Sequence, residues 1–191
     1  FINESLKLWT TPSDAIQAGI GMVHQHFMLF ESMTVLENIV LGSEPNKYLG
    51  FVDFQFAEEK LSSLLETYNF SINLNQTISE LSVGQRQMVE ILKTLYRSAE
   101  LIILDEPTAV LTPRERVDLF SSLKDFKKAG KSIILITHKI DEVIENADHV
   151  SVMRSGKLIS SLPIESTSQK QISAEIVGSS KTKKISRNKA K

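Results

Sequence analysis

The sequence predicts an α/β fold, a mostly parallel sheet flanked by helices, with a helical subdomain inserted into it. Two patterns indicate this fold. From residue 79 to 136, short continuous apolar runs alternate with amphipathic stretches, as in sheets whose strands are buried on both faces. From residue 31 to 78, apolar residues instead recur at spacings of three and four, which is typical of helices.

A short helix followed by a strand is the first predicted pair of elements. Thr11 is a suitable N-cap, Pro12 fits the first helical position, and Gly19 ends the helix. A strand is then expected over residues 20–24. The chain begins at Phe1 without a methionine, within what resembles a strand, so we expect a segment upstream of it.

The predicted helical subdomain, residues 31–78, contains two helices. A capping box from Thr34 to Glu37 starts one helix, which Gly42 ends. The second is expected over about 53–69. Its apolar stripe is formed by Leu61, Leu64, Leu65 and Tyr68.

After residue 79 the predicted order is helix, strand, helix, strand. A helix is expected over about 84–97, a strand at 101–104, a helix from Thr112 and a strand at 132–136. A hairpin over 150–159 closes the sequence of predicted elements.

The charge of the chain is uneven although its net value is −1. Residues 179–191 contain six basic residues and no acid, leaving 16 basic residues against 23 acids in the rest. We expect this basic end to be a linker, and the acidic body gives no general attraction to nucleic acid. The absence of cysteine excludes disulfides and thiolate metal sites, and no apolar run approaches the ~20 residues that cross a bilayer.

Two acids follow the apolar strand 101–104. In an open α/β sheet, ligands bind beyond the carboxyl ends of the strands. Asp105 would suit Mg²⁺, a cation that prefers oxygen ligands, and Glu106 could activate a water for attack on phosphorus. Taken alone, the same acids could simply be the solvated end of a buried strand.

A glycine-containing turn, Ser82-Val83-Gly84-Gln85, opens the helix expected over 84–97. Backbone N–H groups at such a helix start, with a hydroxyl and a glycine, can bind phosphate. The simpler alternative is that Ser82 only caps the helix.

Two further polar residues follow predicted strands. Gln25 comes after the strand over 20–24 and could orient water or a magnesium ligand. His138 comes after the second strand and could donate a hydrogen bond to a phosphoryl group. Each residue alone is also compatible with no function.

Taken together and in this order, these motifs resemble the ATP-binding subunits of ABC transporters. The resemblance covers about residues 11–159 and implies the P-loop NTPase fold of the ABC type. The matching motifs are Val23-His24-Gln25 (the Q-loop), Leu81 to Gln85 (the signature motif, with Val83 where glycine is commonest), Leu101 to Glu106 (Walker B) and Thr137-His138 (the switch histidine).

The resemblance implies roles for these residues. Gln25, Glu106 and His138 would be catalytic, with Asp105 and Gln25 binding Mg²⁺. The residues Ser82, Val83, Gly84 and Gln85 would bind the ATP of a partner ATPase half, which lies on the same polypeptide or in a dimer. Other implied partners are transmembrane permease subunits and, indirectly, a substrate-binding protein, with no nucleic acid, at the cytoplasmic face of the membrane.

The stretches 21–30 and 107–113 resemble the first ATPase half of nucleoside and simple-sugar importers, and the run from His24 to Phe27 favours nucleosides. The implied layout is an ATPase core of 1–30 and 79–160, the helical subdomain 31–78, a C-terminal helical segment 161–178 and the tail 179–191. Phe27, Phe30 and Met33 could line a groove for the membrane subunits, or pack in the core.

Two departures from the family pattern affect these expectations. Thr112 stands where an aspartate usually contacts the partner subunit. No Gly-x-x-x-x-Gly-Lys-Ser/Thr occurs in the chain, so we expect this loop upstream of Phe1 and weak ATP binding by the 191 residues alone. Two alternatives stay open: a soluble ABC ATPase of translation or DNA repair, and a non-catalytic remnant.

Overall fold

The computed structural model describes residues 9–45 and 51–178, in two compact units. The first unit runs to Ile136 and the second begins at Thr137. The strand-like start at Phe1 and the basic tail 179–191 lie outside the described residues. The assignment of 1–30 and 79–160 to one core stays a prediction, and the units are described separately below.

A parallel three-stranded sheet organises the first unit. Its strands are β1 (Ile20–Val23), β2 (Leu101–Asp105) and β3 (Ser132–Ile136), in the order β1-β2-β3. In this register, Leu104 pairs with Val23 on one side and with Leu135 on the other. The predicted parallel α/β arrangement is therefore confirmed, with β1 ending at Val23 rather than at residue 24.

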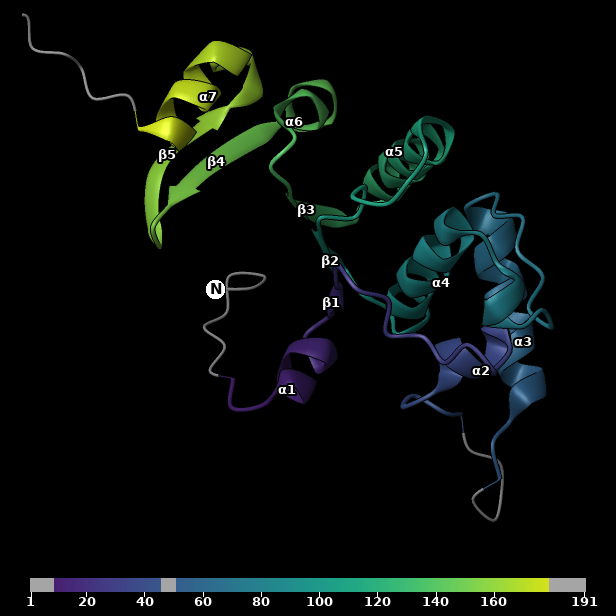
Figure 1. Ribbon diagram of the computed structural model, residues 1–191. Helices are drawn as coiled ribbons and strands as arrows, with labels where there is room; N and C mark the ends of the chain where they lie inside the picture. Colours follow the sequence, from purple (N-terminus) through teal and green to yellow (C-terminus); the bar gives the residue numbers. More distant parts are fainter. Residues whose placement is uncertain (1–8, 46–50, 179–191) are drawn as a thin grey trace, which may run out of the picture. The chain divides into compact units, whose positions relative to one another are not determined.

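Three helices accompany the sheet, and each begins at a capping sequence. α1 (Pro12–Gln17) follows the Thr11 cap, α4 (Val83–Tyr96) follows Ser82, and α5 (Pro113–Lys128) follows Thr112. Along the chain, α4 comes directly before β2 and α5 directly after it (Figure 1). The predicted starts of these helices are confirmed to within one residue.

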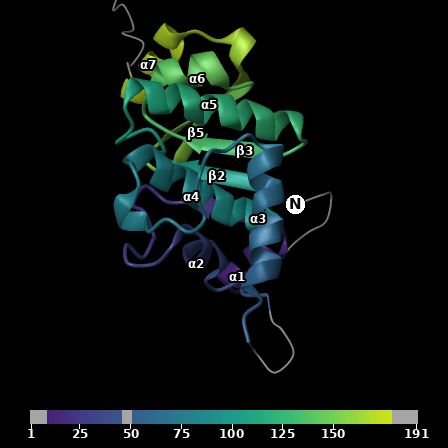
Figure 2. The same ribbon diagram turned by 90° about the vertical axis from the view of Figure 1, so that its right-hand side faces the viewer.

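The helical block contains α2 (Val35–Val40), α3 (Phe54–Thr67) and the 3₁₀ turn η2 (Ile78–Glu80). Helices α2 and α3 pack together and against α4 (Figures 1 and 2). The buried residues of this cluster are Val35, Leu36, Ile39, Val40, Ala57, Leu61, Leu74, Ile78, Leu81, Val89, Leu92 and Tyr96. The predicted helices over 35–41 and 53–69 are thus present, joined by loops.

Helix α4 belongs to both apolar clusters of the first unit. Val89 and Leu92 pack with α2 and α3, whereas Ile91 and Leu95 pack with the sheet and α5. Because one face of α4 is buried against α2 and α3 and another against the sheet and α5, this helix joins the helical block to the sheet.

The second unit is a hairpin with two helices. Its elements are α6 (Ile140–Asn146), β4 (His149–Arg154), β5 (Lys157–Pro163), the 3₁₀ turn η3 (Ile164–Ser166) and α7 (Gln169–Val177). The hairpin is present and longer than predicted, with left-handed residues in its two-residue turn. Of the segment 161–178, expected to be helical, the first three residues continue β5, and η3 and α7 occupy most of the rest. None of the described helices of the chain has the length and apolar character needed to span a bilayer.

Candidate functional site

The sheet places three predicted site residues at one edge. Asp105 is the last residue of β2, Glu106 follows it, and Gln25 lies two residues beyond the end of β1. Because β1 and β2 are parallel and Val23 pairs with Leu104, the chain leaves both strands at the same edge. Neighbouring strands lie about 4.8 Å apart, so these segments start from adjacent positions.

The backbone of Glu106 has an unusual conformation. Its φ of 48° lies in the left-handed region, which is uncommon for a residue with a side chain. Its N–H donates to the carbonyl of Ile136 at 2.9 Å, and its carbonyl accepts from the N–H of Ala109 at 3.1 Å. Thr108, within this turn, is only 1% exposed. The acid therefore sits on a compact turn tied to the end of β3, and such conformations cluster at functional sites.

Magnesium would fit this edge only if the substrate phosphates supplied some of its ligands. The described residues contain no group of three or more acids or histidines that could hold a metal alone. Magnesium is commonly bound through one or two carboxylates together with substrate phosphates, and Asp105 supplies such a carboxylate. Gln25, which is exposed, offers a neutral amide oxygen.

His138 follows β3 by two residues and belongs to the second unit. It is an exposed residue. Its convergence with Gln25, Asp105 and Glu106 stays a prediction.

Two buried polar side chains fix the loop that follows Gln25. Glu90, on α4, accepts a hydrogen bond from the N–H of Met28 at 2.5 Å. Asn38, on α2, accepts from the N–H of Phe30 at 2.7 Å and donates to the Phe30 carbonyl at 3.0 Å. The backbone is held from beneath, while the side chains of Met28 and Phe30 remain 63% and 56% exposed.

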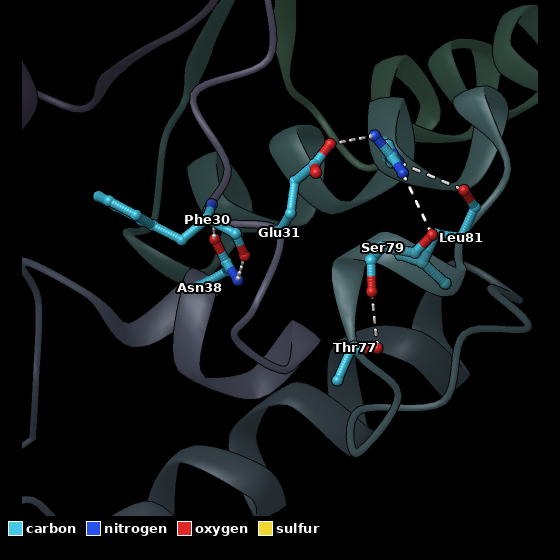
Figure 3. Close-up of polar contacts among 7 residues, drawn as sticks. Phe30, Glu31, Asn38, Thr77, Ser79 and Leu81 are labelled. Carbon is cyan, nitrogen blue, oxygen red and sulfur yellow. Dashed lines mark hydrogen bonds and ion pairs between the residues drawn. The ribbon is translucent and has the colours of Figure 1, made fainter.

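The same loop is also tied to the start of α4. The Glu31 carboxylate pairs with the Arg86 guanidinium at 3.0 Å, and that guanidinium also donates to the carbonyls of Ser79 and Leu81, both at 3.3 Å. Figure 3 shows Glu31 directed toward the backbone segment that holds Ser79 and Leu81. The segment after Gln25 is therefore connected to the segment that precedes the Ser82 turn.

The turn from Ser82 to Gln85 forms a complete capping box. The Ser82 hydroxyl accepts from the N–H of Gln85 at 3.2 Å, and the Ser82 N–H donates to the Gln85 side-chain oxygen at 2.9 Å. Gly84 is buried and Val83 is 39% exposed. The capping alternative is thus true for Ser82, and it leaves the Ser82 hydroxyl hydrogen available for another acceptor.

That acceptor is Glu115, on α5. Its Oε1 accepts from the Ser82 hydroxyl at 3.1 Å and from the Gly84 N–H at 3.0 Å. Its Oε2 accepts from the N–H and the hydroxyl of Thr112, at 3.0 and 2.8 Å. These hydrogen bonds, the one from the Thr112 N–H foremost, lower the pKa of Glu115.

Sequence reasoning missed the roles of Glu115, Glu90 and Asn38. A polar residue within the apolar stretch of α2 was an available signal for Asn38. Glu115 is recognisable as a capping-box acid three residues after Thr112, but nothing local indicates its reach to α4, 31 residues earlier in the chain.

Comparison with protein families gives one match. The family model described as ABC transporter matches residues 3–109. This span includes the strands β1 and β2, the turn from Ser82 to Gln85, and the pair Asp105 and Glu106.

Curated relatives extend the similarity. The chain is 48% identical over 170 residues to the nucleoside import ATP-binding protein NupA of Lactococcus lactis, covering 89% of this chain and 33% of the relative. It is 45% identical over 168 residues to the guanosine import ATP-binding protein NupO of Bacillus subtilis, covering 88% and 33%. It is 42% identical to the galactose/methyl galactoside import protein MglA of Treponema denticola, covering 96% and 37%. The chain thus spans about a third of the length of these relatives.

Solved structures share the fold. The ADP conformation of MJ1267, an ATP-binding cassette of an ABC transporter, matches with a TM-score of 0.69 and 27% identity, over 86% of this chain and 67% of that one. A nucleotide-free ATP-binding cassette matches with a TM-score of 0.66 and 28% identity, over 80% and 64%.

Proposed function

The chain belongs to the ABC transporter family, and from this premise we propose that it binds and hydrolyses ATP to energise an importer. The observation that carries the proposal is the placement of Gln25, Asp105 and Glu106 at one edge of the parallel sheet. An edge of this kind is where open α/β sheets bind their ligands.

Each residue at this edge has a proposed task. Asp105 would hold Mg²⁺, which would neutralise phosphate charge when bound. Glu106 accepts the proton of the attacking water, and Gln25 orients that water and the ion. The left-handed turn at Glu106 holds the acid in a fixed position at the end of β2, so little rearrangement is needed before reaction. The proposed task of His138 is to donate a hydrogen bond to the transferring phosphoryl group.

The turn at the start of α4 serves a second nucleotide. Ser82, Val83, Gly84 and Gln85 contact the ATP of a partner ATPase half on the same polypeptide or in a dimer. ATP then bridges two surfaces that are otherwise separate, so closure of the pair depends on nucleotide.

The loop after Gln25 is the proposed route to the membrane. Its exposed Met28 and Phe30 side chains, on a backbone held by Asn38 and Glu90, form an apolar contact surface for permease subunits. Phe27 and Met33, which are half-buried, belong to the same segment of the chain and are proposed to contribute to this surface. The protein would therefore lie at the cytoplasmic face of the membrane, bound to these subunits.

The proposed cargo is a nucleoside or a simple sugar, with nucleosides favoured. NupA and NupO, which are named for nucleoside and guanosine import, are 48% and 45% identical to this chain. MglA, which is named for galactose/methyl galactoside import, is 42% identical. Permease subunits and a substrate-binding protein select the cargo, so this chain supplies the energy and not the specificity.

The test is ATP hydrolysis by the full-length product of the gene, reconstituted with its permease and substrate-binding protein. We expect hydrolysis to rise when a nucleoside is added with its binding protein. Stimulation by a sugar instead would keep the motor function and change the cargo. No ATP hydrolysis under any condition would contradict the proposed function.

A further inference from the structure

The donors proposed to bind the partner's ATP are already occupied in this structure. The Ser82 hydroxyl and the Gly84 N–H each have one hydrogen to donate, and both hydrogens go to Oε1 of Glu115. A phosphate oxygen needs the same two hydrogens. The inference that follows rests on the function proposed above, and it concerns what controls that site.

Gly84 shows how closely the carboxylate approaches. A Cβ at this position would come within 2.5 Å of Glu115 Oε1 and 2.6 Å of its carboxyl carbon. Such contacts are far too short, so the absence of a side chain at Gly84 is what allows Glu115 to lie over the start of α4. A negative carboxylate here also interacts favourably with the positive end of the helix dipole, as a phosphate would.

Capping of α5 does not require this contact. Glu37 makes the same capping box on α2, accepting from the N–H and the hydroxyl of Thr34 at 2.8 and 3.0 Å. Its hydrogen bonds stay within that one turn. In Glu115, Oε2 alone performs the capping through Thr112, and Oε1 is left to bind another helix.

We propose that Glu115 is a positioning residue. Its carboxylate occupies the phosphate-binding position at the start of α4 and must leave this position before the partner's ATP can bind. The carboxylate carries a charge of the same sign as the phosphate, so the two exclude each other by repulsion as well as by competition for donors. Oε2 keeps its bonds to Thr112 while Oε1 leaves, which lets the carboxylate pivot without uncapping α5.

The experiment compares Glu115→Gln with the matched variant Glu37→Gln in the full-length product of the gene. Both substitutions remove the charge of a capping-box acid. Only Glu115→Gln removes a charge that lies against the start of α4. The chain contains no cysteine, so single introduced cysteines give specific sites for fluorescent labels within it. Closure of the two nucleotide-binding units is followed by Förster transfer while a non-hydrolysable ATP analogue, adenylyl imidodiphosphate, is titrated.

We expect Glu115→Gln to lower the concentration of adenylyl imidodiphosphate that gives half-maximal closure by about three- to tenfold relative to wild type. Glu37→Gln should leave it unchanged. A purely structural role would weaken nucleotide binding or leave it unaltered, so an unchanged or raised half-saturating concentration in Glu115→Gln overturns the proposal.

A second measurement separates this proposal from the function on which it rests. If wild type shows no nucleotide-driven closure, the proposed function fails, and inorganic pyrophosphate is then titrated against the ¹⁵N-labelled chain. Tighter binding by Glu115→Gln, seen at the amide signals of Gly84 and Gln85, supports competition by Glu115. Equal binding in wild type and both variants overturns it.

Discussion

The two polar regions of the first unit bring their residues together by different means. At the sheet edge, Asp105, Glu106 and Gln25 are placed by backbone pairing between parallel strands. At the junction of α4 and α5, Glu115 reaches Ser82 and Gly84 through its side chain, across a long separation in sequence.

The difference indicates how each region tolerates change. A strand end keeps its position when one side chain is replaced, because the ladder of backbone hydrogen bonds remains. The polar contact between the start of α4 and α5 depends on one carboxylate, so one substitution there removes that contact, while the apolar packing between the two helices remains. We therefore expect substitutions at the edge to alter chemistry with little loss of stability, and substitutions at the junction to alter the connection between helices.

The largest expected effect tests the edge. Glu106→Gln in the reconstituted full-length protein should keep ATP binding and lower turnover by about 100-fold or more, because the amide cannot accept the proton. Steady-state ATPase assays and nucleotide binding measure the two quantities. Glu100→Gln, an exposed acid before β2, is the control and should retain turnover. Unchanged hydrolysis in Glu106→Gln would remove Glu106 from the role of base.

A second prediction examines the buried polar contact that holds the loop after Gln25. Asn38→Ala should lower the free energy of unfolding by about 2 kcal/mol, because the backbone groups of Phe30 and Thr34 lose buried partners. Urea unfolding measures the change, with the exposed Asn75→Ala as the control. Equal stability of the two variants would show that the loop after Gln25 does not depend on Asn38.

A double-mutant cycle sharpens the account of the junction. Gly84→Ala alone should destabilise the fold by about 1 kcal/mol, because the new methyl displaces the Glu115 carboxylate. In a Glu115→Ala background the same change should be neutral or stabilising, since alanine is the better helix former. Additive effects in urea unfolding would mean that the approach of Glu115 is not what restricts residue 84.

The smallest expected effect is a pH dependence. The pKa of Glu115 is lowered from 4.5, so the charged carboxylate stabilises the folded state above that value, and this stabilisation is lost as pH falls through the lower folded pKa. The stability difference between wild type and Glu115→Gln should therefore be full at pH 7 and decrease as the pH is lowered below 4.5 toward the folded pKa. Unfolding midpoints across this pH range measure it. A constant difference would contradict a charged, hydrogen-bonded Glu115.

Much of the fold could be predicted from local sequence. The caps at Thr11, Thr34, Ser82 and Thr112 start their helices as expected, because an N-cap acts within one turn. The strands β2 and β3 follow from their apolar runs. The end of β5 was misjudged, since the strand continues through polar residues up to Pro163 where a helical segment was expected.

The candidate site likewise contains features that local sequence predicts and features that it does not. The position of Asp105 and Glu106 at the carboxyl end of β2 could be predicted from the apolar run that precedes them, and their role stays a prediction. The left-handed backbone of Glu106 and the contact from Glu115 to Gly84 could not be predicted, because both depend on packing between segments far apart in the chain. Local patterns contain no information about such distances.

The sharing of α4 between both apolar clusters has a consequence for how the first unit melts. Neither cluster can come apart without stripping one face of this helix, so the helical block and the sheet lose their structure in a single cooperative step. Amide hydrogens in the middle of α4 should accordingly be among the slowest to exchange with solvent deuterium.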